Sequence, residues 1–255
     1  ILVGAGLLSL PNATTHRIPF IDALFISTTS VCVTGLTTVD VATSFTHIGH
    51  IIIMILIQIG GIGAMTFTSF FALSFMGKSS FTSKMMLKDM LNEDRTGGLF
   101  RVILNILFVT LFIEGIGAYF IYMDVRGSLP GGTQQELFYA MFHAVSAFCN
   151  AGISTLSGNM YDPLVADKYN LHFWIAMLII FGGLGFPIVF NYLKLLHHLL
   201  MNGIKILIGK QKHYIHTPRI INVHTYIVVI STLILLITGT AFYLFFEYDN
   251  TLGDL

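Results

Sequence analysis

Long apolar stretches separated by polar connections dominate the hydropathy pattern of this chain. Four of them occupy residues 48–75, 102–123, 172–196 and 227–246. An α-helix needs about 20 consecutive apolar residues to cross the hydrocarbon core of a bilayer. Each stretch reaches that length, so the pattern predicts four membrane-spanning helices. A further segment, residues 1–8, is too short to cross, and we interpret it as the outer end of a helix that begins earlier. No basic region precedes it, so no cleaved signal peptide is expected.

Two further segments, residues 22–31 and 136–148, are apolar but too short to span a membrane. One interpretation is a pair of helices that lie at the membrane surface. The other is a pair of re-entrant half-helices, each followed by a glycine-containing coil. Non-helical backbone at membrane depth is tolerated only where it is buried in protein or lines water. Under the second interpretation, these segments therefore form a pore or a binding site.

The composition supports a membrane protein. Hydrophobic residues make up 55% of the 255 residues and charged residues only 10%, with a mean hydropathy of +0.79. Soluble domains carry about 25% charged residues, so a soluble enzyme is excluded. The net charge of +0 gives no sign of nucleic-acid binding, and two cysteines form neither a disulfide framework nor a zinc motif. The fold class we expect is an all-α polytopic membrane protein.

The charges are distributed unevenly between the connections. Ten of the 13 Lys and Arg residues fall in residues 76–101 and 194–224. By the positive-inside rule these connections are cytoplasmic, which places both short segments at the outer face. Nine of the 13 acidic residues lie on the outer side. An acidic outer face attracts cations, although ordinary solvation of the loops explains the bias equally well.

Residues 25–36 and 142–153 form an internal repeat. In each copy a cysteine precedes a glycine by three positions, Cys32 before Gly35 and Cys149 before Gly152. Each copy is followed by an apolar stretch that carries Gly-Gly-apolar-Gly, at residues 60–63 and 182–185. Two spans return the chain to its starting side, so the units are parallel. Parallel copies of an outer loop act together only around a common axis, which predicts a central pore.

The repeat divides the chain into five parts. We predict a first repeat with a truncated opening helix, a cytoplasmic connection, a second repeat, another cytoplasmic connection and the start of a third repeat. These parts cover residues 1–75, 76–101, 102–196, 197–219 and 220–255.

The two loops are candidate cation-binding segments. Glycine permits φ above zero, which lets neighbouring carbonyls point the same way, as dehydration of a cation requires. The negative end of the half-helix dipole also favours a cation. For one copy alone, a glycine that merely ends a helix is the simpler interpretation, and two aligned copies favour a filter. The candidate ligands are Cys32, Val33, Thr34, Gly35, Cys149, Asn150, Ala151 and Gly152.

Four ordered motifs, at residues 30–36, 58–63, 146–152 and 182–187, resemble the Trk/Ktr/HKT superfamily of potassium transporters, in particular its bacterial TrkH/KtrB pore subunits. The resemblance implies four span, pore-helix, filter-loop and span units around one pore, of which about two and a half lie in this chain. It implies a selectivity filter of backbone carbonyls that conducts K+. Gly35 in the first loop favours K+ over Na+, which is the alternative ion.

The same resemblance implies partners and location. We expect a homodimer in the bacterial inner (plasma) membrane, with filter loops facing outside and a cytosolic RCK/KTN nucleotide-binding ring of the TrkA/KtrA type as the gating partner. It implies no organic cofactor in this chain and no enzyme activity. The third and fourth filter loops and the family's gate lie outside this sequence.

Two alternatives and two polar residues remain open at this point. Broken helices also build ion-coupled secondary transporters of small solutes, although parallel repeats and the lack of a second intramembrane charge count against that class. A membrane enzyme is disfavoured because no His, Asp and Glu cluster occurs at one depth. Glu114 lies within a predicted span, where it either pairs with another helix or serves the ion pathway, and Gln58 presents the same choice.

Overall fold

The computed structural model describes residues 1–76, 99–185, 188–189 and 223–248, and the described residues are helical apart from loops and one isolated bridge between Thr14 and Phe45. The chain divides into two compact units, Ile1–Phe186 and Pro187–Leu255. Each unit is described by itself. The predicted connections at residues 76–101 and 197–219 lie largely outside the described residues.

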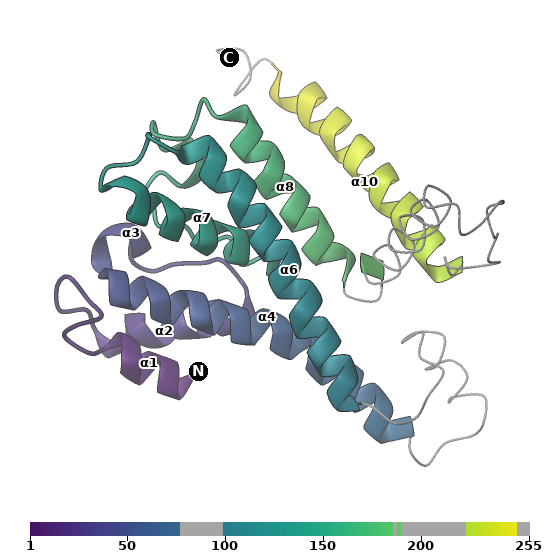
Figure 1. Ribbon diagram of the computed structural model, residues 1–255, viewed down its shortest axis with the longest axis horizontal. Coiled ribbons are helices and arrows are strands. Elements are labelled where there is room, and N and C mark those ends of the chain that lie inside the picture. Colours follow the sequence, from purple (N-terminus) through teal and green to yellow (C-terminus); the bar gives the residue numbers. More distant parts are fainter. Residues whose placement is uncertain (77–98, 186–187, 190–222, 249–255) are drawn as a thin grey trace, which may run out of the picture. The chain divides into compact units, whose positions relative to one another are not determined.

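The first unit contains two sets of packed helices (Figure 1). The first set comprises α1 (Leu2–Leu8), α2 (Phe20–Cys32), α3 (Val41–Ser44) and α4 (His47–Met76). The second comprises α6 (Leu99–Val125), α7 (Gly132–Phe148), the 3-10 turn η1 (Asn159–Tyr161) and α8 (Tyr169–Leu184). The described part of the second unit is mainly α10 (Val223–Glu247).

The helices follow the predicted pattern closely. The four long apolar stretches form α4, α6, α8 and α10, and the two short segments form α2 and α7. Helix α8 ends earlier than predicted, at Leu184, because Gly185 adopts a φ of 80° that a continuing helix does not allow. The short elements α3 and η1 were not predicted, since four residues or fewer carry no periodic signal.

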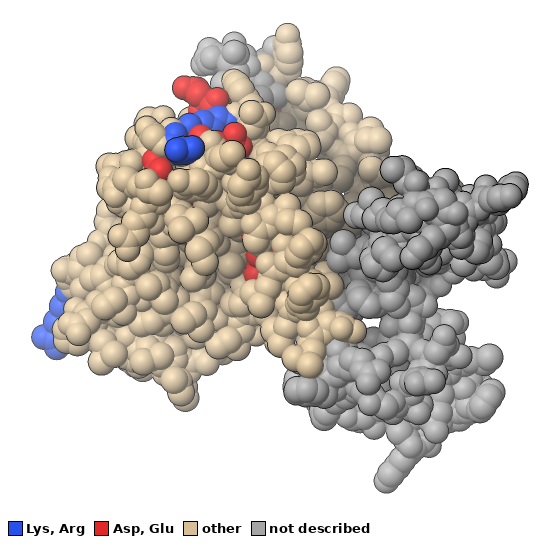
Figure 2. Space-filling model, in the orientation of Figure 1, with Lys and Arg blue, Asp and Glu red and all other residues tan. Residues whose placement is uncertain are grey.

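The length and hydropathy of several described helices support a membrane protein. Residues Leu104–Val125 and Tyr226–Glu247 are long and apolar enough to cross a bilayer. Shorter apolar helices occupy Phe20–Cys32, His47–Gly63 and Tyr169–Leu184. On the face shown in Figure 2, the charged side chains of the described residues lie mainly near the connections between α1 and α2 and between α6 and α7. The broad area beside them is uncharged apart from one small acidic spot near the middle of the view.

Two apolar clusters hold the first unit together. One is built mainly by α6, α7 and α8 and includes Ile121, Tyr139 and Leu171. The other is centred on α1, α2 and α4. It also contains Phe142 and Ile153, which belong to α7 and the loop after it. The second helix set therefore contributes to the core of the first, and this contact fixes the ends of α2 and α7 relative to each other.

Candidate functional site

The loops that follow α2 and α7 share one backbone conformation. Val33 and Asn150, each just after its helix, have positive φ angles of 55° and 61°. The next residue in each loop turns back to its helix: Thr34 N–H donates to the Thr29 carbonyl at 2.9 Å, and Ala151 N–H donates to the Ser146 carbonyl at 2.7 Å. Positive φ is rare for residues other than glycine, so its occurrence at both aligned positions indicates that the two loops have the same backbone fold.

A hydroxyl side chain ties each loop to its own helix. Thr29 Oγ1 accepts a hydrogen bond from the Leu36 N–H at 3.1 Å. At the aligned position, Ser146 Oγ donates to the Ile153 carbonyl at 2.7 Å. Each tie reaches the residue directly after the loop glycine. The hydroxyls therefore fix the span of backbone that lies between them and the glycine.

The backbone carbonyls of these loops are uncommitted. Among the described residues, no group donates a hydrogen bond to the carbonyls of residues 32–34 or 149–151. Of these six residues only Ala151 is buried, so the uncommitted carbonyls of the loops are open to a bound cation or to water.

The two loops touch at their glycines. Gly35 has a φ of 81°, and a Cβ on it would lie 2.6 Å from the Ala151 carbonyl oxygen. Gly152 has a φ of 68°, and a Cβ on it would meet only the Gly35 Cα, at 3.9 Å. The structure thus brings together the two sets of residues that sequence analysis predicted as ligands. Only glycine satisfies both the backbone angle and the close approach at position 35.

Glycines on the long helices α4 and α8 pack closely against the ends of α2 and α7, where the loops begin. Gly60 of α4 packs against the Val31 carbonyl, and Gly182 of α8 packs against the Phe148 carbonyl, with no room for a Cβ at either position. Gly61 lies against Cys149, where a Cβ would sit 2.5 Å from Sγ. Three glycines of the Gly-Gly-apolar-Gly motifs, Gly60, Gly61 and Gly182, therefore allow the long helices to pack closely onto the half-helix ends.

A cavity of about 220 Å³ adjoins both loops. Its walls come from the ends of α2 and α7, from α4 and from α6. The lining residues are Cys32, Val33, Gly61, Ile62, Thr110, Phe148, Cys149 and Asn150. Several predicted ligand residues from both loops thus face one space.

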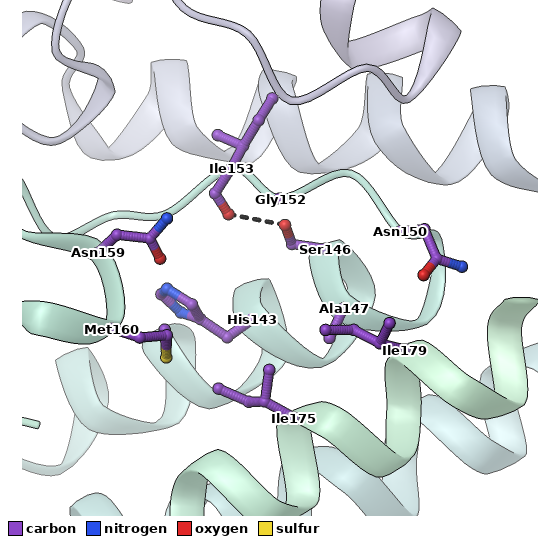
Figure 3. A pocket seen from close by; sticks show the side chains of 10 residues that line it. All are labelled: His143, Ser146, Ala147, Asn150, Gly152, Ile153, Asn159, Met160, Ile175 and Ile179. Carbon is purple, nitrogen blue, oxygen red and sulfur yellow. Dashed lines mark hydrogen bonds between the residues drawn. The ribbon is translucent and has the colours of Figure 1, made fainter. Parts of the chain in front are cut away.

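A second cavity, of about 320 Å³, lies beside the second loop (Figure 3). His143 and Ser146 of α7 line it, and Ile175 and Ile179 of α8 close another side. The oxygen and nitrogen of the Asn150 amide are assigned from their neighbours: with the two atoms exchanged, the nitrogen donates to the Ile179 carbonyl and the oxygen accepts from the Gly183 N–H, both at 3.2 Å. The second loop is thereby attached to α8.

His143 forms a buried brace that sequence analysis missed. Its Nδ1 lies 2.9 Å from the Tyr139 carbonyl and its Nε2 lies 2.9 Å from Ser154 Oγ. A carbonyl only accepts, so Nδ1 carries the proton and Ser154 Oγ donates to Nε2. Ser154 Oγ also accepts from the Leu156 N–H at 3.0 Å. A histidine inside a predicted apolar half-helix was the available signal, but its partner lies beyond the loop.

Asp40 joins the segments that follow the two loops. Its carboxylate accepts hydrogen bonds from Ser157 Oγ at 2.5 Å, from Thr43 Oγ1 at 3.0 Å and from the Ala42 N–H at 3.0 Å. Partial burial alone would raise the pKa of Asp40, but these hydrogen bonds outweigh it and hold the pKa below its ordinary value of 3.8. Asp40 also caps α3, which explains why that short helix begins there.

Glu114 and Gln58 are paired. Gln58 Nε2 donates to Glu114 Oε2 at 3.0 Å, and Cys149 Sγ lies 3.9 Å from Glu114 Oε1. Sequence analysis left open whether Glu114 pairs with another helix, and the structure supplies that partner on α4. The same bond gives Gln58 an interhelical partner, which is one of the two roles that the sequence left open for it.

The histidines at the start of α4 are committed to packing. His50 Nε2 lies 2.8 Å from the Val41 carbonyl, and the His47 ring packs on Phe138 with centroids 4.2 Å apart. No group of three or more His, Cys, Asp or Glu side chains suited to a metal ion occurs within the described part of the chain.

The helical fold and the two bilayer-length apolar helices among the described residues are compatible with a membrane protein. Loops lined by backbone carbonyls form the selectivity filters of cation channels. The chain matches the family model described as "TrkH: Cation transport protein" over residues 5–250, and it belongs to this TrkH family. The resemblance seen in the sequence is thus confirmed. The family is one of transporters and not of enzymes.

The relatives include three uptake proteins of bacteria. The chain is 35% identical to Ktr system potassium uptake protein B of Vibrio alginolyticus, over all of this chain and 52% of that protein. It is 37% identical to the Bacillus subtilis protein of the same name, over 76% of this chain and 43% of the relative. Potassium/sodium uptake protein NtpJ of Enterococcus hirae is 39% identical, over 73% of this chain and 41% of the relative. The chain thus spans about half the length of these relatives.

Proposed function

We propose that this chain is part of the pore-forming subunit of a potassium uptake transporter. In this proposal K+ passes along the backbone carbonyls of the two glycine loops, at Cys32, Val33, Thr34 and Gly35 and at Cys149, Asn150, Ala151 and Gly152. The observation that carries the proposal is the shared conformation of the two loops, which meet at Gly35 and Gly152 with uncommitted carbonyls.

Several physical features favour a cation in this site. Carbonyl oxygens replace the water shell of a weakly hydrated cation such as K+. Helices α2 and α7 both end at the loops, so their negative ends are directed at the same region. The adjoining cavity of about 220 Å³ has room for a hydrated ion that has left or is about to enter the loops.

Potassium is the ion we infer, with sodium as the competitor. Two of the relatives described above are named as potassium uptake proteins and one as a potassium/sodium uptake protein. Within the superfamily that the sequence resembles, glycine at the first-loop position accompanies a preference for K+, and serine there accompanies Na+ permeation. Gly35 therefore favours K+.

The assembly is also part of the proposal. We infer parallel repeats around a central pore, a homodimer in the bacterial inner membrane with the loops facing outward, and gating by a cytosolic RCK/KTN ring of the TrkA/KtrA type. The Ktr relatives are named as protein B of a Ktr system, which supports a separate partner protein. The bias of Lys and Arg toward residues 76–101 and 194–224 supports the orientation.

The proposal is tested by measuring cation uptake into proteoliposomes that contain the full-length protein. K+ and Na+ uptake are compared for the native sequence, Gly35→Ser and the control Gly183→Ser, each with and without a KtrA-type ring. We expect K+ preference in the native protein and in the control, because Gly183 faces open space among the described residues. Gly35→Ser should lower the ratio of K+ to Na+ flux.

A folded protein without cation flux, with and without the ring, contradicts the proposal. That outcome favours the ion-coupled solute transporter instead. Unchanged selectivity in Gly35→Ser contradicts the assignment of the first loop.

A further inference from the structure

Glu114 is a buried acidic residue in the middle of an apolar helix. It is 4% exposed, and it is the one Asp, Glu, Lys or Arg residue in residues 102–123. A carboxyl group at this depth costs several kcal/mol, and such groups mark functional positions in membrane helices. Packing alone does not explain its presence, because an apolar side chain would fill the same volume more favourably.

The two oxygens of the Glu114 carboxyl contact two different parts of the site. Oε2 accepts from Gln58 Nε2 at 3.0 Å, and Oε1 lies 3.9 Å from Cys149 Sγ. Cys149 is the C-cap residue directly after α7, where the second loop begins. Glu114 therefore connects α4 to the base of the second loop.

Helix α4 carries this connection on to the first loop. Two residues after Gln58, Gly60 packs against the carbonyl of Val31 near the end of α2. The next residue, Gly61, presses on Cys149, so the thiol is held between Gly61 and Glu114. The segment 58–61 thus touches the bases of both loops, and Glu114 closes the link between them.

The position of Glu114 along α6 agrees with this role. Thr110 lies one helical turn earlier on the same face and lines the cavity that adjoins both loops. Glu114 itself does not line that cavity. It therefore acts through Cys149 and Gln58 and not as a ligand of the ion.

We propose that Glu114 is a positioning residue that sets ion selectivity, by fixing the base of the second loop relative to the first. This inference rests on the proposed function. Discrimination between K+ and Na+ depends on the arrangement and stiffness of the coordinating carbonyls. When the Glu114 link is cut, the Cys149 end of the loop relaxes and the site adapts to the smaller ion.

The test compares K+ and Na+ flux for the complete protein with Glu114→Ala, Glu114→Gln, Cys149→Ala and the double variant Glu114→Ala/Cys149→Ala. The control is Leu111→Ala, on the same helix but 59% exposed. We expect Glu114→Ala to lower the K+/Na+ flux ratio about threefold or more, because residues in direct contact are energetically coupled. The control should keep the native ratio.

Two variants separate positioning from a purely structural role. Glu114→Gln retains an oxygen that accepts from Cys149, and its NH2 group donates to Gln58 Oε1 once the Gln58 amide turns over by 180°; that oxygen has no partner in the described part of the chain. It should therefore restore most of the native ratio. The double variant should resemble Glu114→Ala alone, because both changes remove the same contact.

Three results overturn the proposal: a native ratio in Glu114→Ala, a native ratio in Cys149→Ala, or additive effects in the double variant. If Glu114→Ala does not fold, Cys149→Ala decides alone, since it removes the contact from the other side. Failure of the proposed function gives a different pattern, in which the native protein itself shows no cation flux or no K+ preference.

Discussion

The first and second glycine loops have the same backbone but different surroundings. In the first, Thr34 is exposed and Leu36 is 62% exposed. At the aligned positions of the second, Ala151 is 0% and Ile153 is 3% exposed. At these two positions the second loop is covered because the first helix set packs on it, whereas Asn150 and Gly152 of the same loop are exposed. The comparison shows that local φ angles and hydrogen bonds set the shape of a loop, whereas its neighbours set its burial.

The bracing of the two loops differs as well. The second loop is held by the His143–Ser154 hydrogen bond, and the aligned positions of the first set hold Ile26 and Thr37, which cannot form that pair. Two further residues attach the second loop to neighbouring helices: Asn150 to α8 and Cys149 to Glu114 of α6. The second loop should therefore be the stiffer of the two.

The largest effect should come from the glycine behind the second loop. In Gly182→Ala the new Cβ would overlap the Phe148 carbonyl, which is backbone and cannot rotate away. We expect a loss of about 3 kcal/mol in stability, at the upper end of overpacking costs, with loss of K+ flux. Thermal unfolding in detergent measures the loss of stability. Gly183→Ala is the matched control, since its Cβ would enter open space among the described residues, and equal melting of the two variants would contradict this packing.

The next effect distinguishes the two loop glycines. Gly35→Ala and Gly152→Ala both place a Cβ at positive φ, which costs about 1–2 kcal/mol. Only Gly35→Ala adds a close contact, at 2.6 Å from the Ala151 carbonyl oxygen. We expect the K+/Na+ flux ratio and the melting temperature to fall further in Gly35→Ala. Equal losses in both variants would show that the loops do not meet as closely as described.

A smaller effect tests the brace that only the second loop has. Ser154→Ala leaves His143 Nε2 buried without its partner, at a cost of about 1–3 kcal/mol. The aligned change in the first set, Thr37→Ala, removes an exposed side chain and should stay within about 0.5 kcal/mol. Chemical denaturation of the two variants measures the difference. If both changes were silent, the second loop would not be the more strongly braced.

The smallest effect concerns the bridge between the segments that follow the loops. The pKa of Asp40 lies below its ordinary value, so its carboxylate stabilises the fold above that value, and this contribution is lost as the pH falls through the lowered pKa. Asp40→Asn should therefore flatten the loss of stability at acid pH and change neutral stability by only about 0.5 kcal/mol. Melting temperatures measured between about pH 3 and pH 7 test this. A steeper acid loss in the variant would contradict the sign of the shift.

Apolar length and glycine spacing were sufficient to predict most helices of the described chain. The stretches 48–75 and 102–123 form α4 and α6, and the short segments form α2 and α7. Apolar segments removed from water become helical because a helix pairs its own backbone N–H and C=O groups. The third stretch, 172–196, does not form one unbroken helix, because α8 stops at Leu184, and its predicted end lies outside the described residues. Hydropathy did not register the positive φ of Gly185.

Sequence alone determined the membrane class, the family and the residues that form the two loops, because these depend on local composition, periodicity and short motifs. Only the tertiary structure decided that Gly35 meets Ala151, that Glu114 reaches Cys149 and Gln58, and that His143 is held by Ser154. Each of these contacts joins separate elements, most of them distant along the chain. Such pairings depend on how whole helices pack, and a single sequence carries no local signal for them.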